Sequence, residues 1–212
     1  MISDKLFNIN ELSFNNAVEL IDKVCNENNK LKLTEIDFIL NLDEKEIVNI
    51  FFKSYKYFGQ EEFLLIEDFI NKNLEMENKD FLSDLIYFAT DFGLNINYEK
   101  IINLLIIDKE DIDCLVLACL EYINMNIKYL YIEELIKNLE YLRNNVLYHQ
   151  NEQLFASLIL FKITNKTDYL HFIQELIDYE KSNLDFLNNI LKNAMYNERY
   201  FNYSEFNKKV KR

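Results

Sequence analysis

The first notable feature of this 212-residue chain is what it almost lacks: it contains no proline and only two glycines. The tight turns of β-sandwiches and β-barrels depend on these two residue types, so their scarcity argues against an all-β fold. Periodic apolar runs of helical length fill the chain instead, and 50% of its residues are hydrophobic. We therefore predict an all-α fold with a sizeable buried core.

Other scarce features bear on the compartment of the protein. The three cysteines are an odd number in a chain of this size and do not suggest a disulfide framework. The most apolar runs, at 114–120 and 153–161, are far shorter than the roughly 20 residues that a membrane span needs. The first twelve residues lack the apolar core of a signal peptide. We expect a cytoplasmic protein that does not bind membranes.

Patterns that would indicate catalysis or a metal site are also missing. His171 and Glu175 are four residues apart and would share a helix face, but no third ligand joins them at a fixed spacing. The acidic cluster at 108–113 lacks the glycine and the distant glutamate of a calcium-binding EF-hand loop. We expect no catalytic residues, no metal and no cofactor. An enzyme with a dispersed site around His171 and Glu175 is the alternative.

Positive charge is scarce in most of the chain, and the formal net charge is −13. Residues 1–80 carry 17 acids and 9 bases, and residues 81–200 carry 18 acids and 10 bases, so each block has a charge of −8. Residues 201–212 carry one acid and four bases, or +3. An acidic body repels nucleic acid and anionic membranes and attracts cationic partners. We therefore expect a basic protein partner and no nucleic acid.

One seven-residue pattern recurs along the sequence. Its good copies are LIEDFIN (65–71), NYEKIIN (97–103), YIEELIK (131–137) and FIQELID (172–178), and a poorer copy is TEIDFIL (34–40). The segments at 47–59 and 81–93 also correspond, and each ends in Phe-Gly. We predict that Gly59 and Gly93 each end a helix in the left-handed conformation.

The repeating unit is therefore predicted to be two helices joined by a short turn. The first helices are expected at 14–28, 44–58, 80–92, 111–124 and 151–164. The second helices are expected at 33–42, 62–74, 97–107, 129–146 and 168–181. The corresponding units, 14–42, 44–74, 80–107, 111–146 and 151–181, would form a single domain over 1–212, with a C-terminal cap at 183–212 that includes a helix near 183–196.

The four good copies of the pattern start 32, 34 and 41 residues apart. This spacing and the unequal lengths of the units resemble the HEAT and armadillo-like helical repeats, over about residues 14–181. The resemblance implies a short α-solenoid of about five units, in which the second helices line a concave face. A single helix pair cannot bury its own apolar side, so stacked pairs would share one continuous core. A compact helical bundle is the alternative architecture.

Acidic residues at equivalent repeat positions give the candidate binding surface. Stacked units would place them side by side as a ladder facing a basic partner, although acids near helix starts are favourable in any protein. The main hypothesis is a non-catalytic protein-binding module, with a bacterial immunity protein that neutralises a basic toxin as its specific form. The alternative is a structural adaptor that docks its partner through apolar and tyrosine-rich surface. The candidate residues are Glu67, Asp68, Glu99, Glu133, Glu134 and Glu175.

Overall fold

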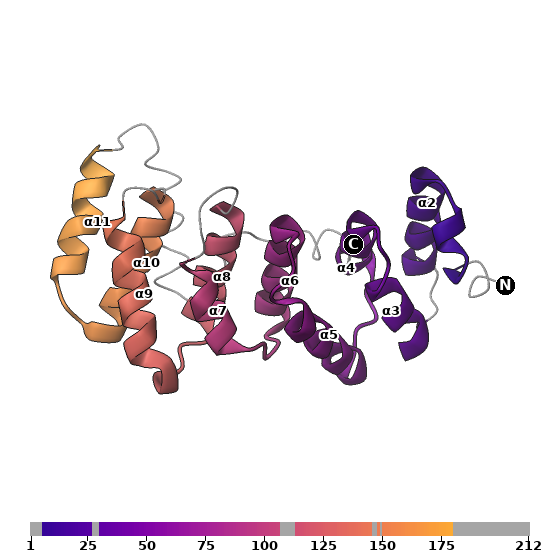
Figure 1. Cartoon of the computed structure of the whole chain (residues 1–212), viewed down its shortest axis with the longest axis horizontal. Coiled ribbons are helices and arrows are strands. Elements are labelled where there is room, and N and C mark those ends of the chain that lie inside the picture. Colours follow the sequence, from indigo (N-terminus) through magenta and orange to yellow (C-terminus); the bar gives the residue numbers. More distant parts are fainter. Residues whose placement is uncertain (1–5, 27–29, 107–112, 146–147, 149, 180–212) are drawn as a thin grey trace. The chain divides into compact units, whose positions relative to one another are not determined.

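The computed structural model describes residues 6–26, 30–106, 113–145, 148 and 150–179 (Figure 1). Regular secondary structure in these residues is helical throughout, with no strand, which confirms the predicted all-α class. Among the described residues, none of the helices combines the length and the apolar character that crossing a lipid bilayer requires. The predicted cap at 183–212 lies outside the described residues, as does most of the acidic cluster at 108–113.

The chain groups into two compact units, and each is described here by itself. Unit 1 comprises the described residues up to Glu75, and unit 2 comprises those from Met76 onward. The helices of unit 1 are η1 (Ile9–Glu11), α2 (Phe14–Asn26), α3 (Leu33–Leu40), α4 (Lys45–Ser54) and α5 (Gln60–Asn73). Helix α2 packs on α4, and α3 packs on both α4 and α5. The core of unit 1 includes the fully buried side chains of Ile21, Ile36, Phe51, Ile66 and Ile70.

Unit 2 repeats this packing over more helices. Its elements are α6 (Lys79–Phe92), α7 (Tyr98–Leu104), α8 (Asp113–Met125), η2 (Tyr129–Tyr131), α9 (Ile132–Asn144), α10 (Gln150–Thr164) and α11 (Asp168–Tyr179). Helix α8 packs on both α6 and α10, while α7 packs on α8 and α9. Helix α10 also contacts α9 and α11. First helices of the predicted repeats thus contact one another, and so do the second helices α7 and α9.

The helix ends agree with the predicted boundaries to within a few residues, apart from the region around Gly59. Gly93 has a φ of 63° and ends α6 in the left-handed conformation, as predicted. The N–H of Leu94 then bonds to the carbonyl of Ala89 at 2.8 Å. Gly59 instead has an extended φ of −121° and precedes α5, so the prediction for Gly59 was wrong. The reason is that α4 already ends at Ser54, and Gly59 begins the next helix rather than ending the last one.

A buried glutamate bonds to the backbone of Gly59 at the start of α5. The Glu62 carboxylate accepts the Gly59 N–H at 2.9 Å and forms an ion pair with Lys30 at 2.8 Å. A β-carbon on Gly59 would lie 2.9 Å from the same carboxylate oxygen, so the end of the Glu62 side chain would have to shift to admit it. Helix α3 starts in a related way, because Glu35 accepts the N–H of Lys32 at 2.8 Å. In both helices an acid in the first turn satisfies a backbone donor that the helix itself leaves unpaired.

Candidate functional site

The predicted acidic residues of unit 1 both lie in the middle of α5. Glu67 is half-buried, whereas Asp68 is exposed and forms an ion pair with Lys72 one turn further along the helix. This ion pair offsets the charge of Asp68 within the helix that carries it. Asp68 therefore contributes less to an acidic surface than the sequence pattern suggests.

The predicted acidic residues of unit 2 are all exposed, and three of them occupy helix starts. Glu99 lies in the first turn of α7, and Glu133 and Glu134 lie in the first turn of α9. Glu175 lies further along α11, one turn after the exposed His171. The repeat alignment placed Glu67 and Glu99 in one register, but Glu67 lies in the middle of its helix. Only the three first-turn acids gain the favourable helix-dipole interaction expected of such positions.

The starts of α7 and α9 lie next to each other, which brings the three first-turn acids to one edge of unit 2. The rings of Tyr98 and Tyr131, at the two starts, are 5.9 Å apart between centroids. The backbone N–H of Lys128, in the turn before η2, bonds to the Tyr98 hydroxyl at 3.3 Å. The Lys128 ammonium lies 5.3 Å from the centre of the Tyr98 ring and bonds to the Asn95 side chain at 3.0 Å.

These contacts hold the turn between α8 and α9 against the turn between α6 and α7. Burial raises the pKa of the Tyr98 hydroxyl above its ordinary value of 10.0, so this group stays a neutral hydrogen-bonding partner at physiological pH. The N–H of Tyr131 also bonds to the Lys128 carbonyl at 3.3 Å and closes the η2 turn. Hydrogen bonds therefore hold the backbone of this turn at Lys128 and at Tyr131.

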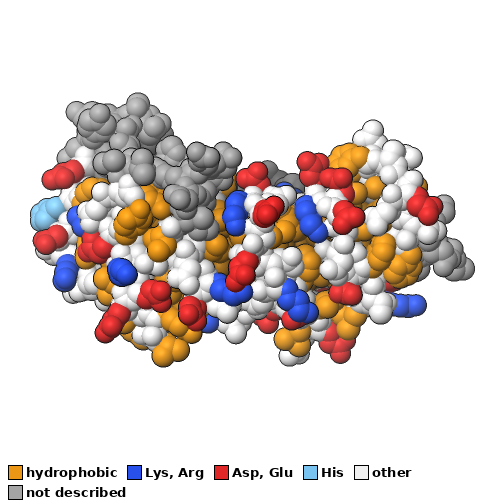
Figure 2. Space-filling view, in the orientation of Figure 1, with side chains coloured by type: hydrophobic (Ala, Val, Ile, Leu, Met, Phe, Trp, Pro, Cys, Tyr) orange, Lys and Arg blue, Asp and Glu red, His pale blue; other side chains and the backbone are white. Residues whose placement is uncertain are grey.

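Two apolar side chains project from this fixed turn. Tyr129 is 81% exposed and Leu130 is 83% exposed, the highest values among the exposed large hydrophobic side chains of the described residues. Met125, at the end of α8, is 43% exposed. Figure 2 shows hydrophobic side chains at the lower end of α9 with acidic side chains beside them. We name this surface the turn patch and define it as Met125, Tyr129, Leu130, Glu99, Glu133 and Glu134.

The apolar part of the turn patch was not predicted from the sequence. The repeat pattern predicts one long helix at 129–146 that includes the segment YLYI at 129–132. In the structure, residues Tyr129–Tyr131 form a separate 3-10 turn, and α9 begins at Ile132. One amphipathic helix face cannot bury four consecutive apolar residues. The apolar run at 129–132 is therefore the feature of the sequence that could have predicted this exposed surface.

The other candidate groups among the described residues are His171 with Glu175, and the three cysteines. Among the described residues, no three His, Cys, Asp or Glu side chains lie close enough together to hold a metal ion. His171 and Glu175 are both exposed on α11. Cys25 and Cys119 are buried, and burial raises the pKa of the Cys25 thiol to about 12. Cys114, in contrast, is exposed.

Comparisons with protein-family models, with curated proteins and with solved structures found no match to this chain. The resemblance to helical-repeat proteins therefore rests on the repeat pattern in the sequence. The candidate site rests on the geometry of the turn patch.

Proposed function

We propose that this chain is a non-catalytic protein-binding module and that its turn patch binds a basic protein partner. The observation that carries the proposal is the pair of almost fully exposed apolar side chains, Tyr129 and Leu130, held beside three exposed carboxylates. Large apolar side chains on a fixed backbone lose little conformational freedom on binding, so they make efficient anchors. Residues at the centres of protein interfaces are enriched in tyrosine for this reason.

The acids around the anchors define the chemistry of the partner. Glu99, Glu133 and Glu134 are exposed, and the contact between Tyr98 and Tyr131 joins the two helix starts that carry them. Rim charges accelerate association with an oppositely charged surface and penalise partners of the same sign. A partner that fits this patch has an apolar pocket surrounded by lysine or arginine.

We propose an α-solenoid as the scaffold for this function. Helix α8 contacts both α6 and α10, and α7 contacts α9, in addition to the contacts of α7 with α8 and of α10 with α9. Stacked helix pairs with this contact pattern usually present an extended surface to another macromolecule. We propose that the repeats of unit 2 are stacked in this way.

The specific form of the proposal is an inhibitor of the immunity-protein class that neutralises a basic toxin. A net charge of −13 favours rapid capture of a cationic protein. Where that toxin is a nuclease, carboxylates such as Glu133 and Glu134 would take the place of substrate phosphates. This form is tested by identifying the partner and by measuring its activity with and without this chain.

The second candidate function is a structural adaptor, and the exposure of Tyr129 and Leu130 also favours it. An adaptor of this kind would dock through the two apolar side chains, with the acids contributing little. Salt separates the two candidates, because the Debye length falls to about 3 Å at 1 M salt. Association steered by charge slows strongly under that condition, whereas apolar docking persists.

The test is capture of partners from a native lysate with the whole chain, followed by affinity measurements on the identified partner. The first variant, Tyr129→Ser with Leu130→Ser, removes the apolar anchors. The second, Glu133→Lys with Glu134→Lys, reverses two rim charges. The matched control, Asp43→Lys with Glu44→Lys, makes the same charge change at two exposed acids of unit 1.

We expect a basic partner that loses affinity with both patch variants and keeps it with the control. Loss of affinity with the serine variant alone, at an association rate that salt does not change, would favour the adaptor. A partner that binds both patch variants as well as the unaltered protein would overturn the proposal.

A further inference from the structure

A second surface of interest belongs to unit 1 and shares no residue with the turn patch. An open groove of about 580 Å³ lies along α2 and η1. Its lining includes Glu11 on η1, Leu12 directly after it, and Asn16, Glu19, Leu20 and Lys23 on α2. The groove therefore combines apolar side chains with charged ones on a regular helix.

The groove follows one face of α2. Asn16, Glu19, Leu20 and Lys23 have the spacing i, i+3, i+4 and i+7, which places them in one row over about 10 Å of helix. The adjoining face of α2 faces the core through Ala17, Ile21 and Val24, and α2 packs on α4. A row of this length matches about two turns of a second helix lying alongside.

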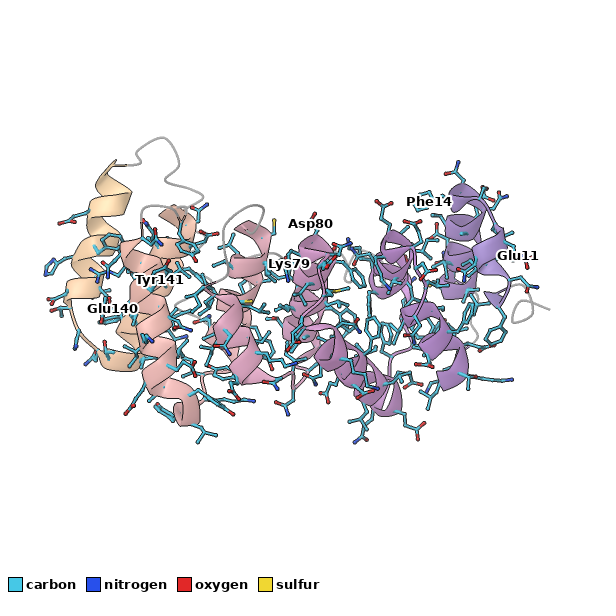
Figure 3. The ribbon with its side chains drawn as sticks, in the orientation of Figure 1. Glu11, Phe14, Lys79, Asp80, Glu140 and Tyr141 are labelled. Atoms are coloured by element: carbon cyan, nitrogen blue, oxygen red, sulfur yellow. The ribbon has the colours of Figure 1, made fainter. Side chains whose placement is uncertain are left out.

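The lining gives the groove an apolar floor and an acidic rim. Leu20 is only 9% exposed and forms part of the floor, while Leu12 is 40% exposed at one end. Glu11 and Glu19 are exposed at the rim, against the single cation Lys23. Phe14, at the first position of α2, is a further exposed apolar side chain of unit 1, and Figure 3 labels it together with Glu11.

We infer that this groove binds a short amphipathic helix of a partner protein that carries basic residues along its edges. Apolar side chains of that helix, one turn apart, would contact Leu12 and Leu20. Lysine or arginine beside them would face Glu11 and Glu19. Helices bound in grooves commonly use such an apolar row with flanking charges for specificity. The inference does not depend on the proposed function, because it rests on other residues in the other unit.

The test uses the whole chain, labelled with nitrogen-15, and amide chemical shifts as the readout. The probe is an amphipathic peptide of leucine and lysine, about 14 residues or four helical turns long. A peptide with glutamate in place of every lysine is its control. We expect the lysine peptide to shift amides between Asn8 and Lys23 and the glutamate peptide to shift none.

Variants separate specific docking from general attraction to an acidic protein. Glu11→Lys with Glu19→Lys should weaken binding of the lysine peptide by about fivefold, since two exposed charge pairs are replaced by repulsion. The variants Asp43→Lys with Glu44→Lys and Glu133→Lys with Glu134→Lys should leave the affinity unchanged. Equal weakening by all three variants, shifts centred outside the groove, or no shifts at all would each overturn the inference.

Discussion

The hydroxyl of Tyr122 on α8 binds the backbone around Ile96, which lies in the turn between α6 and α7. It accepts the Ile96 N–H at 3.0 Å and donates to the Leu94 carbonyl at 3.1 Å. Tyr55, directly after α4, makes a related contact by accepting the Leu31 N–H at 2.9 Å in the turn before α3. In each unit, a tyrosine of one predicted repeat therefore holds the turn of the repeat before it.

Replacing Tyr122 by phenylalanine should destabilise the fold by about 1–3 kcal/mol, because a buried backbone donor and acceptor lose their partner. Tyr122 is fully buried, so water cannot easily replace the hydroxyl. The free energy of unfolding from urea titration measures the effect. The control Tyr129→Phe removes an 81% exposed hydroxyl and should change stability by less than about 0.5 kcal/mol. Equal effects of the two substitutions would contradict this role of Tyr122.

The ion pair between Glu62 and Lys30 predicts a pH dependence of stability. The hydrogen bond from Lys30 holds the pKa of Glu62 below its ordinary value of 4.5, and the bond from the Gly59 N–H acts in the same direction. Because the folded-state pKa is lowered, the stabilisation is complete above the unfolded-state pKa. It is lost as the pH falls through the folded-state value.

We therefore expect Glu62→Gln to be less stable than the unaltered protein at neutral pH, with the difference shrinking below about pH 4.5. Urea titrations of both proteins across this range measure it. The control Glu61→Gln changes the exposed neighbouring acid and should show a much smaller difference at neutral pH. A difference in stability between Glu62→Gln and the unaltered protein that stays constant with pH would contradict a stabilising role of the Glu62 charge.

The left-handed conformation of Gly93 predicts a specific cost for adding a side chain. A β-carbon at this position would meet no atom within 4 Å, so the cost comes from the backbone conformation alone. Gly93→Ala should destabilise the fold by about 1–2 kcal/mol. Gly93→Asn should cost less, because asparagine tolerates this conformation better. Thermal unfolding of the two variants gives the comparison, and an alanine variant as stable as the asparagine variant would argue against the strain.

The cysteines should differ in reactivity. Cys114 is exposed, whereas Cys25 and Cys119 are buried, and the raised pKa of Cys25 keeps its thiol protonated at neutral pH. Iodoacetamide on the folded protein should modify Cys114 first, and all three thiols should react after unfolding. Peptide mass spectrometry after timed quenching measures the order. Rapid modification of Cys25 or Cys119 in the folded state would show that unit 1 or unit 2 opens locally.

The helical class and the helix boundaries were within reach of the sequence, because they depend on local rules. Without proline, and with only two glycines, the periodic apolar runs have few ways to end except at polar turns. The left-handed Gly93 was predictable for the same reason, since it follows directly on an apolar helical pattern. The identical Phe-Gly ending at Gly59 misled the prediction, because α4 ends at Ser54 and Gly59 directly precedes α5.

The candidate site depended on tertiary structure. The acidity of Glu99, Glu133 and Glu134 is visible in the sequence, but their common location follows from the contact between Tyr98 and Tyr131, 33 positions apart. The exposure of Tyr129 and Leu130 follows from η2 leaving the helical path before α9 begins. Local periodicity determines where helices form, whereas packing between distant residues decides which side chains remain outside the core. The sequence by itself therefore determined where the helices form, and only the tertiary structure decided which side chains remain exposed as the proposed binding surface.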